Sequence, residues 1–445
     1  MTQSRAILQT LRDHESRNVT FLDPDGSWPV VWERARGVQV QDAEGKRYLD
    51  LTAAFGVAAA GHANPRVVRA GQRQMATLLH AMGDVHPHAR KAELARELSR
   101  LTFERWTRGR TGKVIFSNSG FEAVESALKT ALLATGRRGV IAFAGAYHGL
   151  GYGVLNTTHR EHFRAPFRTQ LREFGHFVPF PTGKPAELKA TAAAIHDLCR
   201  RETIGAILVE PIQARGGIKL PPPGFLPLLR RLADEFGMLL ILDEIYTGFG
   251  RTGKWFACEH SRTVPDLICL GKALTGGFPL SACVGRADVM DSAWPASNGE
   301  AIHTSTFLGH PVGYAMALAQ IGEIRRRKLP ARATKLGAGL LKELAKLKPA
   351  NGNYGYSARG TGLMVGLEVT HVTDRRAKGP ATAVVLETIK RLLHRGFLFL
   401  PEGEHANVIG FTPPLTITAA QLTRAVRALD RTLAEVQSAA PALPT

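Results

Sequence analysis

Two short, wholly apolar runs constrain the fold of this chain more than any other feature of its sequence. They are Met238–Leu242 (MLLIL) and Leu267–Leu270 (LICL). Neither run alternates with polar residues, so both are predicted to be strands covered on both faces, as in a parallel sheet. Asp243 and Glu244 follow the first run, and Lys272 lies just after the second. Because ligands bind beyond the carboxyl ends of strands in open α/β sheets, an acid and an amine are predicted to meet at one sheet edge.

Strand and helix patterns alternate along the middle of the chain. Val114–Phe116, Val140–Phe143 and Ala206–Val209 have the pattern of short buried strands, and Glu122–Ala134 has helical spacing. This alternation is typical of a parallel sheet flanked by helices. We therefore predict an α/β fold with a mostly parallel central sheet and a smaller α/β domain from about Ala331 onwards.

The length of 445 residues exceeds that of one typical domain. Residues 1–65 are predicted to be an N-terminal segment that contributes to the small domain. Residues 66–328 are predicted to form the large, ligand-binding domain, and residues 329–445 the C-terminal small domain.

Composition excludes several function classes. The apolar content of 44% and the charged content of 21% are ordinary for a soluble globular enzyme. No apolar run approaches the ~18–20 residues of a membrane span. The net charge of +19 raises the possibility of nucleic-acid binding, but the basic residues are spread along the chain and no nucleic-acid motif accompanies them. We therefore expect no nucleic-acid partner and no membrane partner.

The four cysteines and the start of the chain bear on its location. The cysteines are scattered without a C-x-x-C pair, at positions 199, 258, 269 and 283. Such spacing fits reduced thiols better than a disulfide framework, and it offers no metal-ligand pattern. The first residues lack the apolar core of a signal peptide. These features predict a cytoplasmic protein without a metal site.

Other residues at predicted strand ends suit an anion and a planar ring. The turn at Asn118-Ser119-Gly120 precedes the helix, and backbone N–H groups at a helix start bind phosphate. Tyr147, after the strand at Val140–Phe143, is placed to cover a ring, and Glu210 adds a carboxylate to the same edge. One cofactor needs this set: pyridoxal phosphate (PLP), whose aldehyde bonds to a lysine and whose ring nitrogen takes a carboxylate.

A competing motif is set aside. Residues 248–254 (GFGRTGK) match G-x-G-x-x-G and part of a P-loop. A dinucleotide or P-loop site needs a helix that opens at the last glycine. The residues that follow, Trp255–Cys258, have neither a helix cap nor a helical period, so we expect no nucleotide at this loop.

Taken together, the chain resembles the class III aminotransferases, which are PLP enzymes of fold type I. The resemblance runs from about Gly37 to the last predicted helix. It rests on ordered motifs: Asn118–Glu125 (NSGFEAVE), Tyr147-His148-Gly149, Glu210-Pro211, Asp243–Gly253, Lys272, Thr306 and Phe411–Leu415 (FTPPL).

The resemblance implies a role for each matching residue. Lys272 would carry the cofactor as a Schiff base and then shuttle the proton, and Asp243 would hold the ring nitrogen protonated. Ser119, Gly120 and Phe121 would hold the phosphate.

Further cofactor contacts are implied on the two ring faces and around the ring. Tyr147 would stack on one face and Ile245 on the other, with His148 and Glu210 among the cofactor contacts. Thr306 would reach the phosphate of the neighbouring subunit's cofactor, which implies a homodimer with shared active sites.

Three departures from the family pattern affect the prediction. Phe121 stands where a small hydroxyl residue is usual, which suggests backbone contacts only. Tyr246 stands where many members have a glutamine that holds the cofactor's phenolic oxygen, and it has a hydroxyl to donate instead. Gly410 stands where many members have an arginine, gated by Glu210, that clamps the substrate carboxylate.

The loss of that arginine leaves the substrate open. Either Arg251 or Arg359 recruits carboxylates, or the substrate carries none at that place, since Gly410 cannot replace a bidentate arginine. Phe55, at the predicted substrate entrance, indicates a pocket that accepts apolar groups.

We predict an aminotransferase that moves an amino group from an amine or ω-amino acid donor to a keto acid or aldehyde, through pyridoxamine phosphate. A racemase or epimerase of amino acids or lactams on the same fold is the alternative. A non-enzymatic binding role is the third hypothesis, which the complete pair of Lys272 and Asp243 disfavours.

Overall fold

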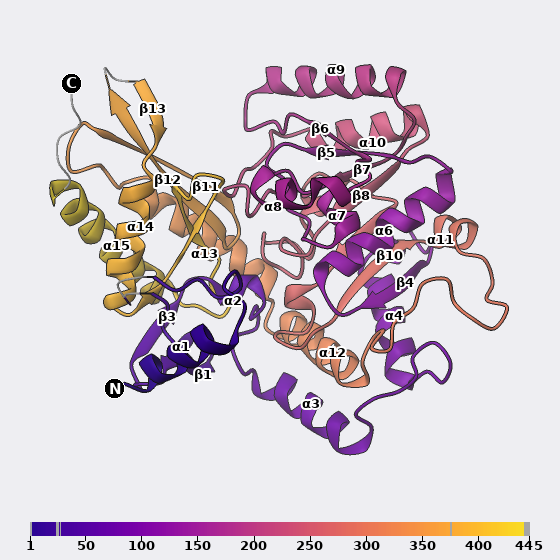
Figure 1. Ribbon diagram of the computed structural model, residues 1–445, viewed down its shortest axis with the longest axis horizontal. Helices are drawn as coiled ribbons and strands as arrows, with labels where there is room; N and C mark the ends of the chain where they lie inside the picture. The colour runs from indigo at the N-terminus through magenta and orange to yellow at the C-terminus, as the bar shows by residue number, and fades with distance from the viewer. Residues whose placement is uncertain (1, 24–25, 27, 374–375, 440–445) are drawn as a thin grey trace.

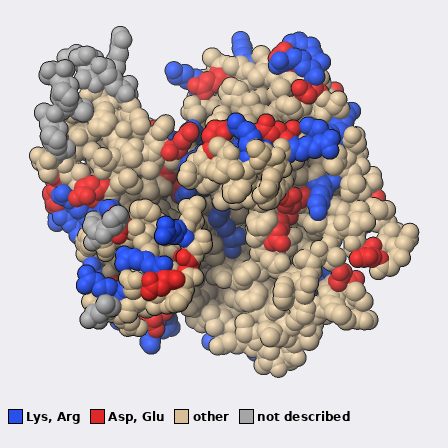
Figure 2. All heavy atoms as spheres, in the orientation of Figure 1, with Lys and Arg blue, Asp and Glu red and all other residues tan. Residues whose placement is uncertain are grey.

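The computed structural model describes residues 2–23, 26, 28–373 and 376–439. Figure 1 shows two masses side by side: one holds the middle of the chain, and the other holds both ends. Figure 2 shows the surface hollowed between them, with Lys or Arg atoms visible inside the hollow.

The larger mass is built on a sheet that, among the described residues, has seven strands in the order β4-β10-β9-β8-β7-β5-β6. The five strands from β9 to β6 are parallel, and β10 runs antiparallel to both of its neighbours. The bounds are β4 Gly112–Ser117, β5 Gly139–Phe143, β6 Gly175–Val178, β7 Ile204–Val209, β8 Leu239–Asp243, β9 Leu267–Leu270 and β10 Ser281–Arg286. The predicted mostly parallel α/β sheet is confirmed.

The central strands are buried on both faces, which explains why their sequences do not alternate. Leu208, Ile241 and Cys269 pack in one hydrophobic cluster with helix α6 (Gly120–Thr135). Their neighbours Leu240 and Ile268 pack in a second cluster, with helix α10 (Phe225–Phe236). Since successive residues of a strand point to opposite faces, a helix on each face requires apolar residues at every position.

The helices described by the structure are α1 Gln3–His14, α2 Ala53–Gly56, α3 Pro65–Thr77, α4 Ala89–Leu101, α5 Phe103–Trp106, α6 Gly120–Thr135, α7 Tyr152–Leu155, α8 Glu161–Arg164, α9 Pro185–Arg201, α10 Phe225–Phe236, α11 Ala287–Ala293, α12 Pro311–Arg326, α13 Leu329–Leu344, α14 Thr382–His394 and α15 Ala419–Ala439. Short 3₁₀ turns add η1 Ala165–Gln170, η2 Ala257–His260 and η3 Lys272–Leu274. None of these helices is both long and apolar enough to cross a membrane.

Two smaller sheets form the second mass with α1, α13, α14 and α15 (Figure 1). The N-terminal strands β1 Trp32–Arg36, β2 Gln39–Asp42 and β3 Arg47–Asp50 are extended by β14 Phe397–Leu398 from the C-terminal part. The other sheet holds β11 Tyr354–Thr361, β12 Met364–Thr373, β13 Arg376–Pro380, β15 Leu400–Glu402 and β16 Val408–Phe411. The pairing of β3 with β14 is consistent with an N-terminal segment that contributes to the small domain, although the predicted domain limits stay predictions.

The glycine-rich loop at residues 248–254 is held by a buried carboxylate and opens no long helix. Glu244 is fully buried and accepts hydrogen bonds from the N–H groups of Ala257 (2.8 Å) and Cys258 (2.8 Å). These residues form the one-turn η2. The loop therefore lacks the helix start that a dinucleotide or P-loop phosphate requires.

A substitution at Gly337 tests how closely α13 packs against the turn at Gly362 between β11 and β12. A Cβ at Gly337 would lie 1.7 Å from the carbonyl oxygen of Gly362, while a Cβ at Gly339 meets nothing within 4 Å. We expect Gly337→Ala to lower the free energy of unfolding by about 1–3 kcal/mol, because backbone must move. The matched change Gly339→Ala should instead raise it by up to about 1 kcal/mol through helix propensity. Urea unfolding followed by circular dichroism measures both, and equal effects would contradict the packing.

Candidate active site

A cavity of about 380 Å³ opens at the carboxyl ends of the parallel strands. Predicted site residues supply most of its polar lining: Tyr147, His148, Glu210, Asp243, Tyr246 and Lys272. Gly120, Phe121 and Ile245, which were also predicted, line it too. Among the described residues, no group of three His, Cys, Asp or Glu side chains is placed to hold a metal ion.

Lys272 begins the η3 turn directly beyond β9, in a left-handed backbone conformation (φ +40°). Strain of this kind persists where surrounding structure holds a side chain in one place, often at a functional site. Its Nζ lies 4.3 Å from the centre of the Tyr246 ring. Burial lowers the pKa of Lys272 below its usual value, against the opposing effect of Asp243 and other carboxylates.

Asp243, at the end of β8, is paired with His148. The histidine Nδ1 donates to Asp243 Oδ2 at 2.8 Å, and both side chains are almost completely buried. The second carboxylate oxygen accepts from the N–H of Ile245 (3.1 Å). Nε2 of His148 is buried and has no hydrogen-bond partner among the described residues. The carboxylate is thus fixed in orientation by a ring nitrogen and a backbone amide.

Glu210, at the end of β7, ties two loops of the cavity together. Its oxygens accept from the N–H groups of Tyr147 (3.0 Å) and Ala214 (3.2 Å). Burial raises the pKa of Glu210 to about 7, an effect that the nearby Asp243 increases. In this arrangement Glu210 holds the backbone of two loops. Its predicted contacts with the cofactor and the substrate stay predictions.

The N-terminus of α6 faces the cavity through Gly120 and Phe121. Glu122 accepts from the N–H of Ser119 (2.7 Å) and from its hydroxyl (2.8 Å), which fixes the turn. The N–H groups of Gly120 and Phe121 have no acceptor in the part of the chain that the structure describes. A side chain at position 120 would approach Ile245 to 3.1 Å, so glycine allows the helix start to come close.

Tyr246 is oriented by a hydroxyl partner outside the cavity. Its phenolic oxygen lies 3.2 Å from Thr412 Oγ1, and burial raises the pKa of Tyr246. A Cβ at Gly56 would lie 2.8 Å from the tyrosine ring, so that glycine makes room for it. The predicted contact of Tyr246 with a phenolic oxygen of the cofactor stays a prediction.

Four of the predicted residues lie away from the cavity lining of this chain. Ser119 points its hydroxyl to Glu122, and Thr306 is exposed in the loop before α12. Phe55 is 52% exposed and has a positive φ of 60°. Gly410 is buried in β16. The exposure of Thr306 agrees with its predicted reach toward a second subunit. That role, and the place of Phe55 at the substrate entrance, stay predictions.

The two arginines predicted as alternative carboxylate binders are not brought to the cavity. The Arg251 guanidinium is buried and donates to the carbonyl oxygens of Leu363 (3.0 Å) and Pro413 (2.5 Å). Arg359 pairs with Glu368 (2.6 Å) and donates to the carbonyl of Gly217. Both guanidiniums link the C-terminal part of the chain to loops that follow strands β7 and β8 of the large sheet.

Sequence reasoning missed two charged residues at this site, Arg215 and Glu402. Arg215 lines the cavity, and its Nη1 lies 3.4 Å from the buried carboxylate of Glu402. These residues are 187 positions apart. The only signal in the sequence was that Arg215 lies five residues after the strand-end Glu210 and beside a glycine pair.

Comparisons with known proteins agree with this geometry. Residues 22–433 match the family model for class III aminotransferases. The ornithine aminotransferase of Toxoplasma gondii is 27% identical, with a TM-score of 0.83 over 98% of this chain and 96% of that one. An (S)-enantioselective ω-transaminase from Thermomicrobium roseum is 27% identical, with a TM-score of 0.88 over 97% and 99%. An amine transaminase from an uncultivated Pseudomonas species, solved in its PLP-bound form, is 29% identical, with a TM-score of 0.82 over 94% and 98%.

The burial of Glu402 predicts a dependence of stability on pH. Burial raises the pKa of Glu402 from its usual 4.5 to about 7, so the folded protein holds this proton more tightly than the unfolded chain. Relative to Glu402→Gln, the wild-type protein should therefore lose stability as pH rises from about 4.5 to 7, on the order of 3 kcal/mol. Urea unfolding at several pH values measures the difference. The exposed Glu300, changed to Gln, is the control, and parallel curves for Glu402→Gln and wild type would contradict the burial effect.

Proposed function

The chain belongs to the class III aminotransferases, which depend on PLP, and from that premise we propose that it moves an amino group from an amine or ω-amino acid donor to a keto acid or aldehyde. The observation that carries the proposal is the meeting of Lys272 and the His148-paired Asp243 in one cavity.

The residues around the cavity fit PLP. The helix start at Gly120 and Phe121 offers free N–H groups for a phosphate, Asp243 offers a carboxylate, and Lys272 an amine. Tyr147 and Ile245 line the cavity where a flat ring needs walls. When bound, the cofactor supplies an aldehyde that condenses with amines and a ring that withdraws electrons from the adjacent carbon.

In this proposal Lys272 holds the cofactor and moves the proton. Its pKa is lowered by burial, so a larger share of the amine is neutral at a given pH and accepts a proton at Nζ. The Tyr246 ring beneath Nζ limits where the amine can point. Asp243, held by His148, places negative charge where a protonated ring nitrogen gains by it.

The glycine at position 410 supports an amine or an ω-amino acid as the donor. The glycine there leaves no guanidinium in β16 to clamp an α-carboxylate, and neither Arg251 nor Arg359 lines the cavity. The similar proteins include an ω-transaminase and an amine transaminase, which agrees with this choice of donor.

We further propose a homodimer with shared active sites. Two neighbouring loops expose large apolar side chains: Leu79, Met82, Val85, Ile302 and Phe307, each more than half exposed. The loops touch through the Thr304 hydroxyl, which donates to Asp84, and through the rings of His80 and Phe307, whose centres are 5.2 Å apart with the planes tilted by 59°. Thr306 is exposed between Thr304 and Phe307, and in the proposed dimer it would reach a second copy's cofactor.

A cytoplasmic location is supported by the thiols. All four cysteines are free in the structure, and three of them are buried. Reduced, buried thiols are ordinary for proteins of a reducing compartment.

The role of Lys272 predicts the effect of its removal. Lys272→Ala should abolish the visible absorbance of the lysine-bound cofactor and lower kcat by about 10²–10⁴-fold, since the proton then lacks its carrier. Absorbance spectra after PLP reconstitution and steady-state rates measure this. The exposed Lys254, changed to Ala, is the control. A lysine-bound spectrum that persists in Lys272→Ala would refute the assignment.

The reaction class is tested by mixing the PLP-loaded enzyme with single amines and ω-amino acids in heavy water, without an acceptor. Transamination predicts conversion of the yellow cofactor to pyridoxamine phosphate, with the effective donors defining the substrate class. If the colour stays, while deuterium enters the substrate and its chirality scrambles, the enzyme is a racemase or epimerase and the proposal fails.

A further inference from the structure

We propose that Arg215 binds the carboxylate of the substrate, with Glu402 as the counter-ion of its guanidinium when no substrate is present. This inference rests on the proposed function, because it assigns the part of the same cavity that recognises a keto acid or the carboxylate end of an ω-amino acid. Arg215 comes from the loop after β7, whereas position 410 is in β16.

Arg215 is the arginine that lines the cavity together with Lys272, among the residues that the structure describes. It is close enough to affect the amine, since its charge contributes to the lowered pKa of Lys272. A carboxylate bound to Arg215 would therefore lie in the same cavity as the group that handles the amine.

The guanidinium of Arg215 has donors that remain open to the cavity. Among the described residues its side chain makes one long pair, Nη1 to Glu402 Oε2 at 3.4 Å. Arg251 also has a nitrogen, Nη2, without a partner in the described chain, but it is only 2% exposed and does not line the cavity. The Arg215 side chain is 33% exposed. An arginine carries five N–H donors in a planar fork that matches a carboxylate, so most of this fork is open to a ligand.

The backbone that carries Arg215 is held in place from both sides. Gln213 and Lys219 exchange two backbone hydrogen bonds (3.1 and 3.0 Å), which close a tight loop around Arg215. Buried Glu210 accepts from the N–H of Ala214 at 3.2 Å. Because the loop is fixed at these points, the guanidinium is presented to the cavity without a large loss of backbone freedom on binding.

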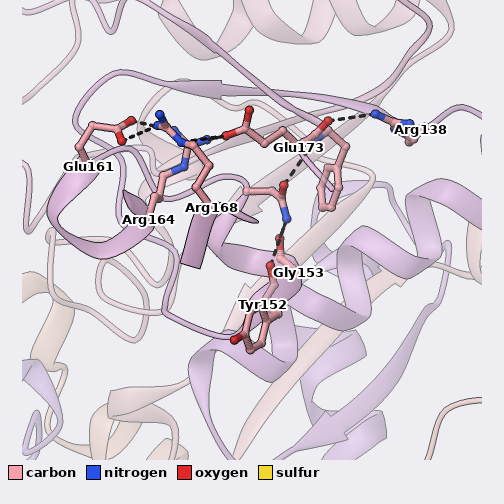
Figure 3. Close-up of polar contacts among 9 residues, drawn as sticks. Arg138, Tyr152, Gly153, Glu161, Arg164, Arg168 and Glu173 are labelled. Atoms are coloured by element: carbon pink, nitrogen blue, oxygen red, sulfur yellow. Dashed lines mark hydrogen bonds and ion pairs between the residues drawn. The ribbon is translucent and has the colours of Figure 1, made fainter. Parts of the chain in front are cut away.

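The carbonyl of Arg215 is anchored a second time by Arg160 and Gly403. Arg160 Nη2 donates to it at 2.5 Å, and the N–H of Gly403 at 3.2 Å. Arg160 directly precedes α8, and Figure 3 shows how that helix is held: Arg164 lies between Glu161 and Glu173, at 3.3 and 2.9 Å.

The neighbouring positions of Glu402 and Gly410 explain why this chain has the Arg215–Glu402 pair in place of an arginine at position 410. Leu400 and Gly410 are paired residues of β15 and β16, and Glu402 follows two residues along β15. A Cβ at position 410 would lie 3.2 Å from Glu402 Cγ, tighter than an ordinary contact. Glycine at 410 therefore leaves the space in which the Glu402 stem reaches Arg215, and a large side chain there would displace it.

The test compares two acceptors, pyruvate and acetaldehyde, reacting with the pyridoxamine-loaded enzyme; acetaldehyde is pyruvate with its carboxylate replaced by hydrogen. Loss of charge-assisted hydrogen bonds in Arg215→Gln should lower the ratio of kcat/KM for pyruvate to that for acetaldehyde by about 10- to 100-fold. Glu402→Gln, which removes the competing carboxylate, should raise the ratio. Arg200→Gln is the matched control, because Arg200 is 73% exposed on α9, and it should leave the ratio unchanged.

Binding of propionate to the PLP-loaded enzyme gives a second measurement that needs no turnover. Weaker binding in Arg215→Gln supports the proposal, and so does a smaller loss in Arg215→Lys, which keeps the charge but not the fork. An unchanged acceptor ratio together with unchanged propionate binding would overturn it. If wild type reacts with neither acceptor, the proposed function fails, while propionate binding still decides the role of Arg215.

Discussion

The structure depends on the burial of opposite charges at one edge of a parallel sheet. Asp243 is buried, and its two oxygens accept hydrogen bonds from a ring nitrogen of His148 at 2.8 Å and from the Ile245 amide at 3.1 Å, so both oxygens have partners before any ligand arrives. Lys272 is placed beyond the neighbouring strand, and burial lowers its pKa. An ion in such a site is tolerated only where its partners are fixed, and the sheet with helices on both faces provides that rigidity.

The carboxylates at this edge of the sheet have two different roles: some hold loops in place, and one is paired with a histidine. The type of residue does not show which role a carboxylate has. Glu210 and Glu244 each follow a strand of the central sheet, and each accepts hydrogen bonds from two backbone N–H groups of the loops around the sheet edge. Glu210 shapes the cavity by holding the loops of Tyr147 and Ala214, whereas Glu244 holds the η2 turn. Asp243 alone of the three is paired with an imidazole. Structural and catalytic carboxylates are thus the same residue types, and their hydrogen-bond partners distinguish the two roles.

Much of this was predictable from local sequence, because apolar strands fix where their last residues lie. The large sheet, Lys272, Asp243 and the helix start at Gly120 follow from such patterns. The arginines do not. Arg251 and Arg215 look equally available in the sequence, yet Arg251 is buried and donates to two backbone carbonyls, whereas Arg215 lines the cavity with one long ion pair. The pairing of Arg215 with Glu402 depends on tertiary contact between the two masses, which no local pattern encodes.

The most direct test of the account is to locate the cofactor on the chain. The PLP-loaded enzyme is reduced with sodium borohydride, digested, and the modified peptide is identified by mass spectrometry. The account predicts one modified lysine, Lys272, in the peptide that follows β9. A modification on a different lysine, or none after reconstitution with PLP, would contradict the assignment of this cavity as the active site.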